Sequence, residues 1–189
     1  MSMLVSSSPP AAAGLQGALA ETLLDYGAEV RGKSGRWQSP ILTALTFGFL
    51  DTAKRLAARG ASVESLHVVS GLGRLDDSAR LLPHADARSR HAAIALASQL
   101  GHVDVVRLLL DSGEDPNRYN PDAMHSHATP LHQAVSADHP DVVRLLAERG
   151  ARLDIRDKIY QGTPLDWAVY LERTEIAEYL RMRVAAISS

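Results

Sequence analysis

The chain repeats itself, and this self-similarity limits its fold more than any other feature. The segment "GHVDVVRLLLDSGEDPN" begins at Gly101, and "DHPDVVRLLAERGARLD" begins 37 residues later at Asp138. A third copy, "GFLDTAKRLAARGASVE", begins at Gly48. Self-similarity at a period of roughly 20–50 residues indicates an array of stacked supersecondary units. The chain is therefore predicted to form such an array.

A second motif lies upstream of the first in each unit. The clearest copies are "ATPLHQAV" (128–135) and "GTPLDWAV" (162–169), which are offset by 34 residues. In the first copy Thr129 can cap a helix, and Pro130 suits the first helical position, where no N–H group is needed. Weaker copies lie at 39–45, 64–69 and 92–97. Each copy predicts a short first helix.

The "DVVRLL" motif predicts a second helix in each unit. Its apolar residues recur at helical spacing and form one buried face. Gly101 can adopt a positive φ and end the first helix, and Gly113 and Gly150 can end the second helix in the same way. In the clearest copy the buried face comprises Val105, Val106, Leu108 and Leu109.

The combined unit, TPLHxA followed by GHxDVVRLLLxxGA, resembles the ankyrin repeat from about Leu15 to Leu180. The match is full at Thr129–Ala134, whereas Asp166 replaces the histidine in the last unit. The resemblance implies an all-α ankyrin-repeat solenoid of stacked helix–turn–helix units with short β-hairpin loops. It also implies that His132 has a structural role, bridging the capping threonine and neighbouring backbone.

The repeats set the expected domain organisation. Residues 1–14 are predicted to be a disordered N-terminal tail, 15–183 a single ankyrin-repeat domain, and 184–189 a C-terminal tail. About five repeats are expected, two of them degenerate or irregular in length. The predicted units are an incomplete one at Leu15–Val30, then Ser39–Val63, a degenerate Glu64–Ala87, Ser89–Asn117, Thr129–Asp154 and Thr163–Arg183.

Bulk composition excludes several classes of partner. The chain of 189 residues has a formal net charge of −2, a pI near 6.4 and no cysteine. Without a broad basic field, nucleic acid is not an expected partner. No apolar run approaches the roughly 20 residues of a membrane span, and no signal peptide is recognisable. The expected location is the cytoplasm, with secreted effector and periplasmic roles as alternatives. The alanine- and arginine-rich composition is compatible with a bacterial source.

Catalytic motifs are absent from the sequence. It contains no GxSxG, P-loop or HExxH pattern. Carboxylates such as Asp104 and Asp141 recur in phase, where they favour the positive ends of helix dipoles. The chain is therefore predicted to be neither an enzyme nor a cofactor-binding protein.

The resemblance implies that a partner protein or peptide binds the concave face, which is formed by the hairpin tips and the ends of the first helices. Aromatic and apolar residues at those positions are expected to be the anchors. The predicted function is a non-enzymatic protein–protein interaction module. The predicted partner-binding residues are Arg36, Trp37, Phe47, Gln99, Leu100, Tyr119, Met124, His125, Tyr160, Tyr170 and Leu171.

Two alternatives to this function come from other features. The long loop 117–132 contains His125 and His127, which in an extended segment would lie on one side and could hold a metal with Asp122. That loop could then be a small metal- or ligand-binding site, or even a hydrolytic one. The main prediction is that the chain binds no metal. Homodimerisation through the N-terminal end is the second alternative, because the incomplete first unit is expected to leave Leu19, Leu23 and Leu24 poorly covered.

Overall fold

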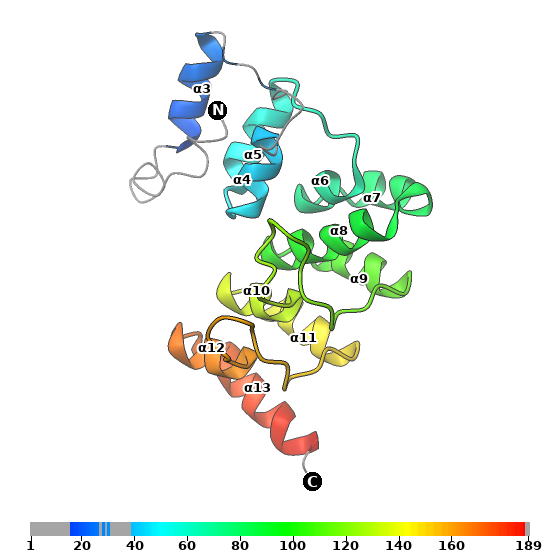
Figure 1. The fold of residues 1–189 in the computed structure, drawn as a ribbon, viewed down its shortest axis with the longest axis vertical. Coiled ribbons are helices and arrows are strands. Elements are labelled where there is room, and N and C mark those ends of the chain that lie inside the picture. The colour runs from blue at the N-terminus through cyan, green and yellow to red at the C-terminus, as the bar shows by residue number, and fades with distance from the viewer. Residues whose placement is uncertain (1–15, 27, 29, 31–38, 188–189) are drawn as a thin grey trace.

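Helices pair consecutively along the chain, as the repeats predict. The computed structural model describes residues 16–26, 28, 30 and 39–187, and it places no strand among them. The helices form an elongated stack with α3 at one end and α13 at the other (Figure 1). In chain order the helices are α3 (Gln16–Asp25), α4 (Pro40–Thr46), α5 (Leu50–Ala58), α6 (Leu66–Gly71), α7 (Leu75–Leu81), the 3₁₀ helix η1 (Leu82–His84), α8 (Ala87–Gln99), α9 (Val103–Asp111), α10 (Pro130–Ser136), α11 (Pro140–Glu148), α12 (Pro164–Tyr170) and α13 (Thr174–Ile187).

The predicted caps begin the first helices of the last two units. Thr163 precedes α12, and its hydroxyl accepts a 3.2 Å bond from the backbone N–H of Asp166, whose carboxylate accepts the Thr163 N–H at 2.8 Å. Before α10, His132 Nδ1 accepts the Thr129 hydroxyl at 2.8 Å, and His132 Nε2 donates to the Gly162 carbonyl at 3.2 Å. The predicted structural role of His132 is therefore confirmed.

Side chains from one unit bond to the turn of the unit before it. His102 Nε2 donates to the Gly71 carbonyl at 2.9 Å, and His139 Nε2 donates to the Gln99 carbonyl at 3.1 Å. Arg173 takes the same position in the last unit and donates to the Ser136 carbonyl at 3.1 Å. These bonds satisfy carbonyl groups that the short first helices leave unpaired at their ends.

The apolar core divides into two clusters that meet near α6 and α8. The larger cluster extends from Leu66 to Leu180 and contains the buried faces of α9, α10, α11 and α13. The smaller cluster is formed by Leu24 on α3, by the buried residues of α4 and α5, by one side of α6 and α8, and by Met124 from the long loop. This loop therefore belongs to the core of a unit that lies far from it in the sequence.

Three expectations differ from the observed fold. The loops predicted to be β-hairpins contain turns in the described residues, because each has few cross-strand backbone bonds. Helix α13 continues through Ile187, so 184–187 is helical rather than a tail. Leu24 is buried, because α3 packs on α5. The predicted tail at 1–14 and the predicted binding residues Arg36 and Trp37 lie outside the described residues.

Helix length also bears on membrane insertion. In the described part of the chain, no helix is long and apolar enough to cross a bilayer.

Candidate partner-binding surface

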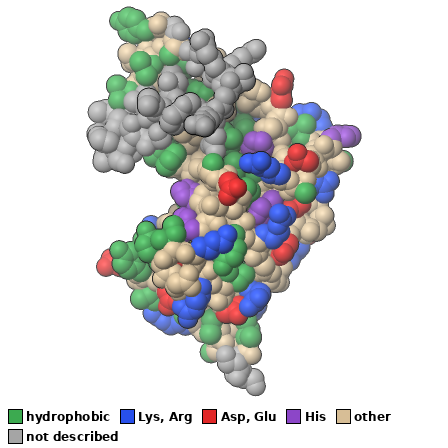
Figure 2. Space-filling model, in the orientation of Figure 1, with side chains coloured by type: hydrophobic (Ala, Val, Ile, Leu, Met, Phe, Trp, Pro, Cys, Tyr) green, Lys and Arg blue, Asp and Glu red, His purple; other side chains and the backbone are tan. Residues whose placement is uncertain are grey.

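Two adjoining hollows run along the ends of the first helices. One, of about 470 Å³, lies between the α10 end, the loop before α12 and the α12 end. The other, of about 390 Å³, lies between the ends of α4, α8 and α10. Ser136 lines both hollows, so they form one surface, which we call the groove. Hydrophobic side chains gather over α12, with histidines beside them (Figure 2).

Aromatic side chains dominate the hollow at α12, which we call the aromatic hollow. It is lined by Tyr160, Trp167, Tyr170 and Leu171 together with Asp166. Tyr160 is 76% exposed and Tyr170 is 85% exposed, whereas Trp167 is half-buried. The structure thus brings together three residues of the predicted binding set, Tyr160, Tyr170 and Leu171.

A buried carboxylate, Asp157, holds Trp167 and the preceding loop in place. Its side chain accepts the backbone N–H groups of Ile159, Tyr160 and Gly162 at 2.7–2.9 Å, and the indole N–H of Trp167 at 3.0 Å. Burial alone would raise the pKa of Asp157, but these bonds lower it to about 2. The carboxylate is therefore charged at neutral pH and fixes one wall of the aromatic hollow.

Asp166 supplies the hollow with a negative charge. Hydrogen bonds from the backbone N–H and hydroxyl of Thr163 lower its pKa. Both bonds end on Oδ2, and among the described residues Asp166 forms no ion pair. Two cations near the hollow have hydrogen-bond partners elsewhere: Arg156, whose charge also lowers the pKa of Asp166, donates to the Gln161 carbonyl at 2.6 Å, and Arg173 donates to the Ser136 carbonyl.

Three residues of the predicted binding set, Phe47, Gln99 and Leu100, line the second hollow. The Phe47 ring is exposed and stacks on Phe49 at a centroid distance of 6.4 Å. Gln99 donates its amide to the Thr46 carbonyl at 2.9 Å, and this bond fixes the end of α4 against the end of α8. The wall of this hollow is thus built by units that are not neighbours in the chain.

Of the predicted binding residues, Leu100 and Met124 are buried and Tyr119 is half-buried, whereas exposed anchors were expected. Leu100 and Met124 are only 9% and 7% exposed and belong to the smaller core cluster. The reason is that the long loop folds back towards α4 and covers this region. Tyr119 donates its hydroxyl to the Arg156 carbonyl at 2.7 Å, and Lys158 lies 4.1 Å above its ring. Lys158 thus occupies one face of this half-buried ring.

The long loop positions its histidines in turns rather than in an extended segment. His125 has a φ of 57°, and its Nε2 donates to the Thr46 carbonyl at 2.9 Å. The rings of His125 and His127 are edge-to-face at 6.2 Å, and His127 packs on Trp167 at 6.0 Å. Burial, followed by the proximity of His125, lowers the pKa of His127.

The structure does not bring together the three residues of the alternative metal site, His125, His127 and Asp122. In the part of the chain that the structure describes, no group of three or more His, Cys, Asp or Glu side chains could hold a metal ion. Asp122 instead lines a separate hollow with His67 and Arg88. The sequence argument failed because it assumed an extended HxH segment, whereas His125 has turn geometry.

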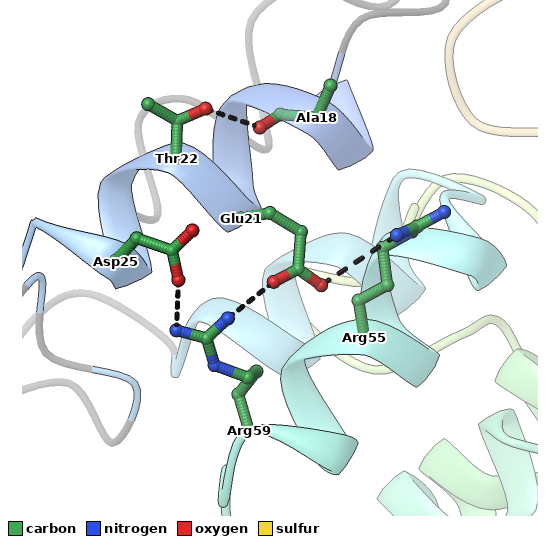
Figure 3. A network of polar contacts seen from close by, with 6 residues as sticks. All are labelled: Ala18, Glu21, Thr22, Asp25, Arg55 and Arg59. Carbon is green, nitrogen blue, oxygen red and sulfur yellow. Dashed lines mark hydrogen bonds and ion pairs between the residues drawn. The ribbon is translucent and has the colours of Figure 1, made fainter.

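At the other end of the molecule, ion pairs attach α3 to α5. Arg59 bonds both Glu21 and Asp25 at 2.7 Å, and Arg55 lies 3.8 Å from Glu21 (Figure 3). Leu19 and Leu23 are exposed on α3, whereas Leu24 is buried. Homodimerisation through this end stays a prediction.

Sequence reasoning missed two side chains of the aromatic hollow. Trp167 packs against His132 at a ring-centroid distance of 5.1 Å and also lines the hollow. Asp166 appeared only as a substitution in the repeat motif. The sequence signal for both residues was the motif itself. In the last unit Asp166 replaces the histidine of TPLHxA, and Trp167 follows it directly.

Comparison with known proteins places these repeats in a family. A family model described as "Ankyrin repeats (3 copies)" matches residues 66–157 and 119–188. An ankyrin repeat-containing protein of Schizosaccharomyces pombe is 41% identical over 87 residues, which are 46% of this chain and 38% of that protein. Ankyrin repeat and SOCS box protein 6 of Mus musculus is 37% identical over 76 residues, 40% of this chain and 18% of that protein. The chain thus spans well under half of the length of these two relatives.

A third relative is covered over most of its length. Cyclin-dependent kinase inhibitor 2A of Homo sapiens is 31% identical over 133 residues, which are 66% of this chain and 82% of that protein. The region matched by the family model, 66–188, includes the capped helices α10 and α12 and the histidines that bond the preceding unit. The chain belongs to the ankyrin-repeat family.

Proposed function

We propose that this protein is a non-enzymatic module that binds a partner protein or peptide in the groove. The observation that carries the proposal is the aromatic hollow, where Tyr160 and Tyr170 are largely exposed beside Trp167. Exposed aromatic rings around a concave surface are typical of protein-binding sites, and tyrosine is enriched among the residues that contribute most binding energy. Ankyrin-repeat proteins in general bind other proteins, which supports the same conclusion.

The groove has a rigid scaffold and exposed anchors, which is the arrangement that binding favours. Asp157 and the capping box at Thr163 fix the backbone that presents Tyr160 and Trp167. A prearranged surface loses less conformational entropy when a partner binds. A cytoplasmic location stays a prediction.

Selection of random peptides displayed on phage tests the proposal. The wild-type protein is the target, and a Tyr160→Ser, Tyr170→Ser double variant is the comparison. Both rings are exposed, so we expect an unchanged melting temperature but at least about 10-fold weaker binding of the selected peptides. Tyr26→Ser is the matched control, since Tyr26 is 89% exposed and lies beyond the end of α3.

The control separates the groove from general tyrosine exposure. Peptides that lose affinity for the double variant and keep it for Tyr26→Ser support the groove. Peptides that bind all three proteins equally, or no enrichment over repeated rounds, contradict the proposal.

A further inference from the structure

The aromatic hollow combines features that suit a cation better than a neutral apolar group. Three aromatic rings and one ionised carboxylate line the same space. An aromatic face carries partial negative charge and attracts Arg and Lys groups within about 6 Å, with tryptophan the strongest of the rings. An apolar ligand group would explain why Leu171 lines the hollow, but it would not explain the carboxylate of Asp166.

Two other tyrosines of the chain already pack with a cation in this way. Lys158 lies 4.1 Å over the ring of Tyr119, and Arg144 lies 5.9 Å over the ring of Tyr179. Among the described residues no cation covers Tyr160 or Tyr170. The hollow thus presents two rings of the kind that elsewhere in this molecule hold a cation.

The nearby cations of the chain do not fill the hollow. Arg156 donates to the Gln161 carbonyl, and Arg173 donates to the Ser136 carbonyl and lies 3.5 Å from Asp138. Asp166 keeps one carboxylate oxygen without a hydrogen bond from the described residues. A cation from a partner would therefore meet both a free carboxylate oxygen and exposed rings.

We infer that the aromatic hollow binds an arginine side chain of the partner, stacked on the rings of Tyr160, Trp167 and Tyr170 and paired with Asp166. This rests on the proposed function and specifies the chemistry of its partner. A guanidinium suits the site better than an ammonium, because it is planar, weakly hydrated and able to stack on a ring while donating to a carboxylate in its plane. The partner segment is thus a peptide that presents arginine.

The test compares three peptides that differ in one side chain. The probe is acetyl-Gly-Ala-Arg-Ala-Gly-amide, and its counterparts carry citrulline or norleucine in place of arginine. Citrulline keeps the shape of arginine without its charge. The wild-type chain has two tryptophans, and a Trp37→Phe variant serves only to assign the Trp167 signal. Binding is followed by the indole N–H signal of Trp167 in NMR spectra.

The arginine peptide should bind at least about 5-fold more tightly than either counterpart, as expected when a charge interacts with several rings. Tyr170→Leu should weaken its binding about 3- to 10-fold, and Asp166→Asn about 3-fold. Tyr26→Leu should leave it unchanged. Thermal melting verifies that each variant is folded, since Asp166 also caps α12.

Three results would overturn the inference. Equal binding of the citrulline peptide would show that the positive charge does not contribute to binding. Equal binding of the norleucine peptide would show that the hollow binds an apolar side chain instead. No shift of the Trp167 signal with the arginine peptide would leave the hollow without this ligand. These results do not affect the outcome of the peptide selection. There, selected peptides that lack arginine but depend on the groove would still support the proposed function.

Discussion

At the scale of single residues, Asp157 has the clearest energetic role. It is fully buried, yet its four hydrogen bonds come from N–H groups that would otherwise lack partners. A buried charge is stable only when it is surrounded by donors in this way. The residue therefore couples the stability of the last unit to the geometry of the binding hollow.

Asp157→Asn should destabilise the protein by about 2–4 kcal/mol, because an amide presents one oxygen acceptor to four donors. Urea denaturation at neutral pH measures the change in the free energy of unfolding. Asp154→Asn is the control, since Asp154 is exposed and forms its ion pair among the described residues with Arg152. Similar losses in both variants would contradict a special role for Asp157.

The stability of the wild type should also depend on acid pH. The pKa of Asp157 is about 2 in the folded state and 3.8 in its ordinary range, so the unfolded chain takes up the proton first as pH falls. Its contribution of about 2 kcal/mol is present above pH 4 and is lost as pH falls from about 4 to about 2. Thermal melts over this range should show a smaller decrease in Asp157→Asn; parallel decreases would contradict the assignment.

At the scale of elements, one turn is used repeatedly between first and second helices. A residue with positive φ follows the first helix, and the next unit packs a side chain against it. Gly73 has a φ of 73° beneath His102, and Gly101 has a φ of 79° beneath His139. In the last two units Asp138 and Glu172 adopt the same positive φ. The turn is thus conformationally fixed, and glycine is required only where a ring lies above it.

Gly101→Ala should cost more than Gly113→Ala, although both glycines have positive φ. An added Cβ at Gly101 would lie 2.8 Å from the His139 ring, whereas at Gly113 nothing lies within 4 Å. Backbone strain alone costs about 1 kcal/mol, and displacement of His139 adds about 1–2 kcal/mol through its bond to Gln99. The free energies of unfolding of the two variants measure the difference; equal values would mean that His139 moves without cost.

The sequence predicted these elements well because the repeat defines them locally. The caps at Thr129 and Thr163 and the positive φ of Gly101 follow from short motifs. The binding residues were harder to predict. Leu171 and Leu100 hold equivalent places directly after a first helix, yet Leu171 is half-buried and Leu100 is buried. Periodicity gives the place of a residue in its unit but not which distant segment covers it.

At the scale of the whole molecule, polar contacts link α4 to α8 and to the long loop, in addition to the apolar packing through which the two core clusters meet at α6 and α8. The Thr46 carbonyl at the end of α4 accepts bonds from Gln99 and from His125, which lie 53 and 79 residues away. In the regular units this carbonyl position receives a side chain from the next unit. The Thr46 carbonyl instead accepts bonds from α8 and the long loop, and not from α6 or α7 of the next unit.

A Gln99→Ala, His125→Ala double variant should separate the unfolding of the two clusters. Residues of α4 and α5 should lose about 1–3 kcal/mol of protection in hydrogen exchange, whereas α9 to α11 should change little. His84→Ala is the control, because His84 is exposed on η1. Equal loss of protection throughout the molecule would mean that the clusters unfold as one unit.

The bond between His125 and Thr46 also affects how the protein folds and how far it can be shortened. In a linear array each unit touches only its neighbours, so units can be added or removed at an end with a local effect. Here removal of α3 to α5 would expose Met124 and leave His125 without its acceptor, although both residues lie more than sixty positions further along the chain. The N-terminal helices are thus completed by a segment synthesised long after them, and their final packing has to await it.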